Sequence, residues 1–350
     1  MYSIYGKHDK FYWDKYYKSL NINDIYYKYE YHMLAATQEN SEAVLYLYED
    51  DNGVVFYPFL KKKITEKCIY KLHPEEKYYD IESTYGFGGP LFFTNKNKEL
   101  LIDGFRKNFD FFCKSNEIIA EFIRFHPLRC NHIDMNKYIN IINANEIVYL
   151  NMDNNLDTIW RSYKHCNRKN IKKAENSGIR IIFEETGGKL DDFLNIYIKT
   201  MDRNQASDYY YFSREYFNNI CNTLNGDFIY FYAIKDEKII SSELILYDQN
   251  YAYSFLGGTL EEYFEYRPNN LLKHEIIKEL KRRGIRYYVL GGGHKRHDGI
   301  YDFKKSFSPN GTTDFYIGTK IHNEKVYFAL IHDWENRNNR KAELFLQYRY

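Results

Sequence analysis

One order of secondary-structure patterns occurs twice in this chain, and this repetition constrains the fold more than any other feature. In the first half, β-rich runs at residues 43–50 and 53–60 flank an Asp-Asn turn signal. An amphipathic helix pattern at 97–116 then leads into another β-rich run at 118–125. A hairpin followed by a helix and a further strand indicates an α+β domain with a mixed, mostly antiparallel sheet flanked by helices.

The second half repeats this order, and a chain of 350 residues is long enough for two ordinary domains. Its expected elements are strands at 227–236, 238–248 and 251–258, a helix at 269–284 and a strand at 285–292. We therefore expect a duplicated domain, with residues 1–152 forming the first copy and residues 153–350 the second.

A single long helix is expected at residues 156–178, at the start of the second domain. Its six cations within thirteen residues are Arg161, Lys164, Arg168, Lys169, Lys172 and Lys173. Lys164, Arg168 and Lys172 are four residues apart, so they share one face and could hold the phosphates of a nucleotide-linked substrate or of a transfer RNA. The net charge of only +1 means that a polyanionic partner requires such a local patch. A solvated basic face is the alternative.

Two other segments combine turn-forming residues with possible binding groups. Glycines and a proline at residues 85–92 predict tight turns that let a ligand or another backbone come close, or simply a rigid connection. Arg267 and Pro268 precede the helix at 269–284, which Asn269 or Asn270 could cap. The free N–H groups at such a helix start can also bind an anion.

The stretch GGGHKRHDGIYDFKKSF, at residues 291–307, is the strongest candidate site. It is not a phosphate-binding P-loop, because Lys-Ser/Thr does not follow its glycines. His294, His297 and Asp298 do not make a convincing ligand set, so no metal is predicted. A plain turn or a loop beside an acyl-transfer centre remains. In the second case Lys304 could neutralise the oxyanion that forms when an amine attacks an ester or thioester.

Cysteine usage and hydropathy suggest a compartment. The five cysteines are an odd number, are widely spaced and include no C-x-x-C pair: Cys68, Cys113, Cys130, Cys166 and Cys221. This pattern argues against a disulfide scaffold and a zinc ribbon. The N-terminal residues have no apolar signal core, and no run approaches the length of a membrane span. We expect a cytoplasmic protein, which for an envelope product would act at the inner face of the membrane.

Seven motifs in this order resemble the Fem-type (FemABX) transferases and the related GNAT-like acyltransferases of cell-surface biosynthesis. They are Y-G-F-G-G-P-L (85–91), E-F-I-R-F-H-P-L (121–128), C-N-R-K-N-I-K-K-A-E-N-S-G-I (166–179), Y-F-E-Y-R-P-N-N-L-L (263–272), L-G-G-G-H (290–294), D-G-I-Y-D-F-K-K-S-F (298–307) and F-Y-I-G-T-K-I-H-N (315–323). The resemblance implies two GNAT-like (acyl-CoA N-acyltransferase) domains in tandem. It also implies transfer of an amino acid from aminoacyl-tRNA to an amine of a peptidoglycan precursor.

The resemblance also assigns roles to particular residues. The family lysine at the transfer centre maps onto Lys304, with Lys305 as its neighbour, and the arginine that contacts precursor phosphate maps onto Arg168. Tyr85 and Gly88 match the part of the substrate cleft that the first domain provides. Gly292 and His294, in the L-G-G-G-H motif, are expected beside the transfer centre.

Three functions follow as alternatives. The first is amide formation on a peptidoglycan or other envelope precursor, free or lipid-linked, with an aminoacyl-tRNA donor and no bound cofactor. Asp298 and Glu243 are its candidate proton acceptors. The second is an acyl-CoA-dependent N-acetyltransferase acting on an amino sugar of a surface polysaccharide, in which Arg267 to Asn270 hold the pyrophosphate, as the GNAT resemblance implies. The third is a non-catalytic binder of a phosphorylated precursor. The sequence does not predict an oligomeric state.

Overall fold

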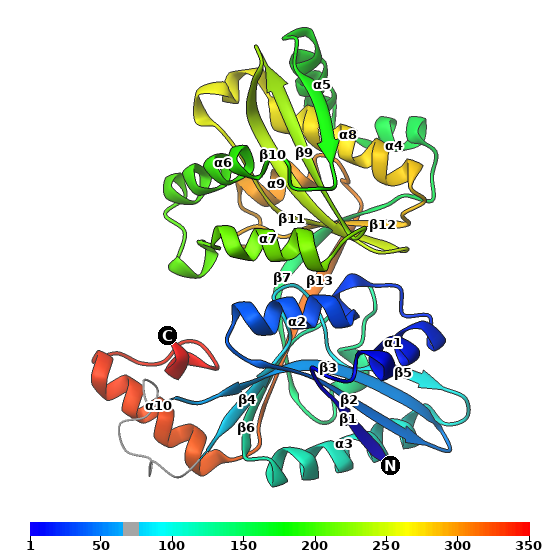
Figure 1. Ribbon diagram of the computed structural model, residues 1–350, viewed down its shortest axis with the longest axis vertical. Coiled ribbons are helices and arrows are strands. Elements are labelled where there is room, and N and C mark those ends of the chain that lie inside the picture. The colour runs from blue at the N-terminus through cyan, green and yellow to red at the C-terminus, as the bar shows by residue number, and fades with distance from the viewer. Residues whose placement is uncertain (66–76) are drawn as a thin grey trace. The chain divides into compact units, whose positions relative to one another are not determined.

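The computed structural model describes residues 1–65 and 77–350, and the chain forms two compact units (Figure 1). Unit 1 comprises Met1–Ile22, Tyr26–Ala144 and Asp314–Tyr350; unit 2 comprises Asn23–Ile25 and Asn145–Thr313. Cys68 lies outside the described residues, and the other four cysteines are free thiols. Among the described residues no helix is long and apolar enough to cross a membrane.

The units divide the chain differently from the expected domains 1–152 and 153–350. The chain passes from unit 1 to unit 2 within β7 (Asn140–Asn151), and the segment from Asp314 onward groups with unit 1. The reason is strand pairing: β13 (Thr312–Ile321) runs antiparallel to β6 (Ile118–Arg124), with Ile317 opposite Arg124. The repeat in the sequence could not show this, because local patterns carry no information about which distant strand is the partner.

Unit 1 is a mostly antiparallel sheet in the order β1-β2-β3-β4-β6-β13, with β5 paired to β3. Among the described strands of unit 1, β4 and β6 are the pair that runs parallel, and helix α3 lies between them in the chain, as a parallel connection requires. Its other elements are β1 (Tyr2–Tyr5), α1 (Lys10–Ser19), α2 (Tyr29–Gln38), β2 (Glu42–Asp50), β3 (Gly53–Lys63), β4 (Tyr79–Glu82), β5 (Leu91–Thr94), α3 (Lys98–Ser115) and α10 (Glu324–Asn338).

Helices cover both faces of this sheet. Neighbouring strand residues point to opposite faces, and both faces carry apolar side chains that must be buried. Tyr57 of β3 packs against Phe105 and Phe109 of α3, with ring centroids 6.1 and 5.2 Å away. Phe56, the preceding residue, instead faces Trp13 of α1 at 6.3 Å. All five side chains are almost completely buried, so the core of unit 1 lies on both sides of the sheet.

Unit 2 repeats the plan with the order β7-β12-β11-β10-β9-β8. Only β11 and β12 run parallel, and α8 lies between them in the chain. Its other elements are α4 (Leu156–Ser162), α5 (His165–Asn176), β8 (Arg180–Glu184), α6 (Leu190–Arg203), α7 (Arg214–Thr223), β9 (Phe228–Lys235), β10 (Lys238–Tyr247), β11 (Tyr251–Thr259), α8 (Pro268–Arg282), β12 (Tyr287–Gly291) and α9 (Gly299–Lys305). The predicted hairpins, and the predicted helix and strand after each of them, are confirmed in both halves.

The sheet of unit 2 is also covered on both faces (Figure 1). Phe231 of β9 belongs to the apolar core that α5 and α8 complete. Tyr230, which points to the opposite face, packs against Phe193 of α6 with ring centroids 5.0 Å apart. The mixed fold predicted from the sequence, with helices flanking a mostly antiparallel sheet, is therefore confirmed in each unit.

The single helix expected at 156–178 is wrong, because α4 and α5 are separate helices. Tyr163 and Lys164 between them are extended, with ψ of 147° and 144°. The Lys164 N–H donates to the Ser306 carbonyl at 2.9 Å instead of to a helical carbonyl. A guanidinium nitrogen of Arg168 donates to the Arg161 and Tyr163 carbonyls, which stabilises the broken end of α4.

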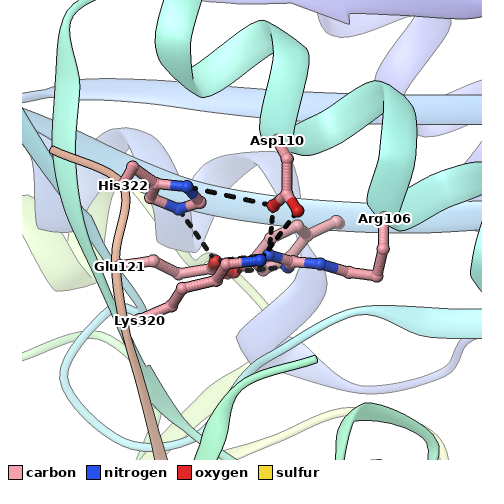
Figure 2. Close-up of polar contacts among 6 residues, drawn as sticks. Arg106, Asp110, Glu121, Lys320 and His322 are labelled. Atoms are coloured by element: carbon pink, nitrogen blue, oxygen red, sulfur yellow. Dashed lines mark hydrogen bonds and ion pairs between the residues drawn. The ribbon is translucent and has the colours of Figure 1, made fainter. Parts of the chain in front are cut away.

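A buried charge cluster fastens β13 and the residue after it to unit 1 (Figure 2). Arg106 of α3 donates to both carboxylate oxygens of Glu121 on β6, each at 3.1 Å, and both side chains are almost completely buried. His322 Nε2 lies 3.2 Å from Glu121 Oε2, and Lys320 Nζ donates to Asp110 Oδ2 at 2.7 Å. Burial alone would raise the pKa of Glu121, but Arg106 and His322 hold that pKa well below its usual range.

Replacing Arg106 with Met should destabilise the protein by about 3–5 kcal/mol at pH 7, because the Glu121 carboxylate then stays buried without its cation. Denaturant unfolding measures the loss. In the wild type the folded protein holds the pKa of Glu121 below its ordinary value of 4.5. The ionised Glu121 carboxylate therefore stabilises the folded state fully above pH 4.5, and this stabilisation is lost as the pH falls further. Lys107→Met, an exposed position on the same helix, is the control. A loss below about 1 kcal/mol would contradict the prediction.

Candidate functional site

The glycine loop, residues 291–293, begins at the last residue of β12, and at two of its positions a larger residue would be strained or would clash. Gly291 has φ of +82°, and a Cβ there would lie 3.2 Å from Lys304 Nζ. A Cβ on Gly293 would lie only 2.0 Å from a carboxylate oxygen of Asp298, closer than any side chain can approach. The glycines therefore allow the chain to pass directly beside an ammonium group and a carboxylate.

Lys304 is held by this loop. Its Nζ donates to the Gly292 carbonyl at 2.7 Å, so the ammonium group of α9 lies where β12 ends. Burial of the ammonium end, and after it the nearby Lys273 cation, lower the pKa of Lys304 to about 8. The carboxylates of Glu243 and Asp298 oppose that effect. The site thus contains a lysine that changes its charge near neutral pH.

Asp298, predicted as a catalytic residue, begins helix α9. Its Oδ1 accepts a hydrogen bond from the Tyr301 N–H and its Oδ2 accepts one from the Lys295 N–H, both at 2.9 Å. This is the geometry of an N-cap, which satisfies backbone donors that the helix leaves unpaired. The carboxylate thus positions the helix that carries Lys304.

Lys305 and His294 lie differently from Lys304. Lys305 Nζ donates to the Tyr301 hydroxyl at 3.0 Å and lies 4.0 Å from Glu146 Oε2. His294 is exposed on the loop. Of the two neighbouring lysines, therefore, Lys304 is the one bonded to the glycine loop.

A buried polar network that the sequence analysis missed as a unit lies in the same unit. Lys273 of α8 donates to Glu243 of β10, to the Ser254 hydroxyl at 3.0 Å and to the Tyr288 hydroxyl at 3.0 Å. Glu243 Oε1 also accepts hydrogen bonds from Ser254 at 2.5 Å and from Tyr288 at 3.0 Å. We call these four residues the Lys273 network. Its members join α8 to β10, β11 and β12.

The sequence does carry a signal for this network. Lys273 follows Leu271 and Leu272 on a helix face that is otherwise apolar, and Glu243 interrupts an apolar strand. Charged side chains are almost never fully buried without a partner, so each interruption predicts a partner of opposite charge. Lys273 and Glu243 are only 3% and 5% exposed, respectively.

Of the predicted phosphate-binding residues, Arg168 and Lys172 lie on α5 and Lys164 directly precedes it, where the chain is bonded to the end of α9. The Lys164 N–H donates to the carbonyl of Ser306, two residues after Lys304. Lys164 and Lys172 are exposed, whereas the Arg168 guanidinium is partly used by backbone carbonyls. The structure therefore brings the basic helix and the Lys304 helix together and leaves two lysines in solvent.

The start of α8 differs from the expectation that Asn269 or Asn270 caps it. Arg267 is the N-cap residue, in the left-handed conformation with φ of +60°, and its side chain is exposed. Asn270 is buried and donates to the Asn167 amide oxygen at 2.8 Å. The Asn167 amide nitrogen, also buried, has no hydrogen-bond partner. The first turn of α8 thus has an unsatisfied buried donor beside it.

Tyr85 and Gly88 belong to unit 1, whereas the other predicted site residues belong to unit 2. The Tyr85 carbonyl accepts a hydrogen bond from the Tyr31 hydroxyl at 2.5 Å. The Gly88 carbonyl accepts one from the Tyr27 hydroxyl and one from the Asn131 amide, each at 2.9 Å. These bonds make the segment a fixed turn.

No group of three or more His, Cys, Asp or Glu side chains in residues 1–65 and 77–350 is arranged to hold a metal ion. Of the residues considered for a metal, Asp298 caps α9. His297 Nε2 lies 3.5 Å from Glu146 Oε2, so it faces a single carboxylate.

Comparison with known families gives one match. Residues 161–305 match the family model described as Acetyltransferase (GNAT) domain. The matched range begins in α4 and ends at Lys305, so it contains the glycine loop, Lys304 and the Lys273 network. No curated protein matches the sequence.

Solved structures share the fold at low sequence identity. The structure described as FemX has a TM-score of 0.65 and 14% identity, and the match covers 86% of this chain and 93% of that one. The tandem GNAT protein from the clavulanic acid biosynthesis pathway has a TM-score of 0.53 and 6% identity, over 92% and 99%. L-PGS from Bacillus licheniformis has a TM-score of 0.52 and 12% identity, over 86% and 90%. The similarity to the tandem GNAT protein extends over nearly the whole of both chains.

Replacing Gly293 with Ala should destabilise the protein by about 1–3 kcal/mol, because the new methyl group displaces the Asp298 cap. Gly299→Ala is the matched control, since a Cβ at Gly299 has no neighbouring atom within 4 Å. Thermal unfolding of both variants measures the difference. Equal melting temperatures would show that the close approach of Gly293 and Asp298 does not hold the loop.

Proposed function

We propose that this chain, an acyltransferase of the GNAT type, transfers an aminoacyl group from an aminoacyl-tRNA to an amine of a nucleotide- or lipid-linked peptidoglycan precursor. The similarity to FemX in fold and the seven Fem-type motifs support this choice of donor and acceptor. The GNAT domain at residues 161–305 supports the reaction type.

The position of Lys304 carries the proposal. The lysine that the Fem-type motif singles out has its ammonium group fixed against the Gly292 carbonyl, at the end of β12. With a pKa of about 8, Lys304 is mostly a cation at neutral pH. A cation fixed in a partly desolvated site stabilises a developing negative charge much more than a cation in water does.

The reaction requires little else from the protein. The neutral amine of the acceptor attacks the carbonyl carbon of the ester, so that a C–N bond forms and the carbonyl oxygen becomes negative. Lys304 stabilises that oxyanion. When the intermediate collapses, the ester C–O bond breaks, the nitrogen loses a proton and the ribose oxygen of the transfer RNA gains one. The products are an amide and a free hydroxyl group.

The basic face of α5 supplies a binding surface for phosphate. Lys172 is exposed on α5, and exposed Lys164 directly precedes this helix, with its backbone N–H bonded to Ser306 of the segment that carries Lys304. The diphosphate of the precursor, or a phosphate of the donor, would bind there through ion pairs with the ammonium groups of these lysines.

Replacing Lys304 with Met should lower aminoacyl transfer by roughly 10²-fold or more, because the oxyanion loses its cation. The assay measures transfer of a labelled amino acid from aminoacyl-tRNA to a nucleotide-linked peptidoglycan precursor. Lys325→Met, an exposed lysine of α10, is the control. In the wild type kcat/KM should fall as the pH rises through about 8, since Lys304 then loses its charge. Full activity in Lys304→Met would reject the role of Lys304.

The start of α8 favours a second function, acyl transfer from acyl-coenzyme A to an amino sugar. A fifteen-residue helix begins there with Pro268, which has no N–H, and the Asn270 N–H donates to the Arg267 carbonyl. The Asn269 N–H and the buried, unpartnered Asn167 amide nitrogen remain as donors beside this first turn. An anion such as a pyrophosphate would satisfy these donors, and exposed Arg267 could pair with it. The GNAT domain match is consistent with such a donor.

Calorimetric titration with acetyl-coenzyme A separates the two donors. A Kd at or below about 100 μM, lost in Arg267→Ala, is the result expected for the second function, because the guanidinium contact to phosphate is removed. Arg180→Ala, an exposed arginine of β8, is the control. Absence of heat with the wild type would reject acyl-coenzyme A as the donor and favour aminoacyl-tRNA.

A further inference from the structure

Lys273 is a buried cation whose presence the fold alone does not explain. It lies on the apolar face of α8, 3% exposed, between the core residues Leu272 and Ile276. Replacing a buried ion pair with apolar side chains of similar size is often neutral or stabilising. Stability alone therefore gives no reason to keep a lysine and a glutamate in this core.

The Lys273 network leads to the transfer site through β12. The Tyr288 hydroxyl bonds to both Lys273 and Glu243 near the start of that strand. The same strand continues into the glycine loop, where the Gly292 carbonyl accepts the hydrogen bond from Lys304. Helix α9, which carries Lys304, packs against β12. Strand β12 is thus bonded to the buried ion pair through Tyr288, near its start, and Gly292, directly after its end, is bonded to Lys304.

The charged groups that act on Lys304 come from three elements. They are Lys273 on α8, Glu243 on β10 and Asp298 at the start of α9. Asp298 is fixed by two backbone N–H groups, and Glu243 is fixed by three donors on one oxygen. Lys273 is therefore a second cation with a fixed position, bonded through Tyr288 to the strand that leads to the Gly292 carbonyl, to which Lys304 donates.

We propose that Lys273 is a positioning residue for Lys304. The Lys273–Glu243 pair, joined to β12 through Tyr288, keeps a fixed positive charge near the Lys304 ammonium group and so sets the pH range in which Lys304 can stabilise the oxyanion. This inference rests on the proposed function, because it assumes that the charge of Lys304 serves acyl transfer.

The electrostatic consequence has a definite direction. A neighbouring cation disfavours the charged form of a lysine, so Lys273 makes Lys304 easier to deprotonate than burial alone would. Burial lowers the pKa of Lys273 itself, and the Glu243 carboxylate opposes that shift. A Lys304 that alternates between charged and neutral forms near neutral pH can also exchange a proton with the attacking amine or the leaving oxygen.

The test measures the titration of Lys304 directly, in protein with ¹³C-labelled lysine and without substrate. The Cε signal of Lys304 is followed by NMR against pH and is assigned with Lys304→Met. In Lys273→Met the midpoint should rise by about one pH unit or more, because the neighbouring cation is gone. Lys273→Arg keeps the charge and should leave the midpoint low. Lys278→Met, an exposed lysine of α8, should change nothing.

A second variant covers the case in which Lys273→Met does not fold. Lys273→Met combined with Glu243→Gln removes both charges and keeps the shapes, so no carboxylate stays buried alone. The midpoint of Lys304 should be higher in this variant than in Glu243→Gln alone, because only the double variant lacks the Lys273 cation. An unchanged midpoint in the folded variants would overturn the inference.

The pH dependence of transfer then connects the titration to function. In the folded variants the fall of kcat/KM at high pH should move upward together with the Lys304 midpoint. If the midpoint moves but the fall does not, Lys273 affects Lys304 without setting the pH range, and the inference fails. If the midpoint moves and no wild-type transfer is found with aminoacyl-tRNA or acetyl-coenzyme A, the coupling stands and the proposed function fails.

Discussion

The ion pair of Lys273 and Glu243 ties four elements of unit 2 to one buried point. One carboxylate oxygen accepts from donors on α8, β11 and β12, so these elements cannot shift relative to β10 without leaving a buried charge unpaired. Breaking such a pair costs several kcal/mol, which exceeds the cost of losing one apolar contact. The end of β12, and therefore the glycine loop, is placed by this requirement. In unit 1 the Arg106–Glu121 pair fixes α3 against β6 in the same way.

The role that we propose for Lys304 is the same for either donor. An amine that attacks an ester and an amine that attacks a thioester both produce an oxyanion, and one fixed cation serves either. The donor would be selected by the binding surfaces around the site. The exposed lysines of α5 fit a phosphate on a large substrate, whereas the buried, unsatisfied amide of Asn167 beside α8 fits a small anion.

The features that could be predicted from the sequence are those that local patterns determine. Hairpins and amphipathic helices follow from periodicity, whereas the role of Lys304, which its motif suggests, stays a prediction. The break between α4 and α5 could not be predicted, since the Ser306 carbonyl that accepts from Lys164 is more than a hundred residues away. The cap formed by Asp298 was predictable, because Asp before a short helical pattern is a common N-cap, although the sequence analysis assigned it to catalysis. In the sequence, the Lys273 network, which joins four elements, is visible only as two charged residues, Lys273 and Glu243, within apolar patterns.

The division of the chain between the units has a consequence for biosynthesis. Apart from Asn23–Ile25, unit 2 is one continuous stretch, Asn145–Thr313, whereas the sheet of unit 1 needs β13 from the segment that follows it. On the ribosome, a nascent chain therefore exposes β6 without its neighbour while the whole of unit 2 is being translated. During this interval the edge of β6 lacks β13, the Glu121 carboxylate lacks His322, and Asp110 lacks Lys320. The unit that is begun first is thus the one completed last.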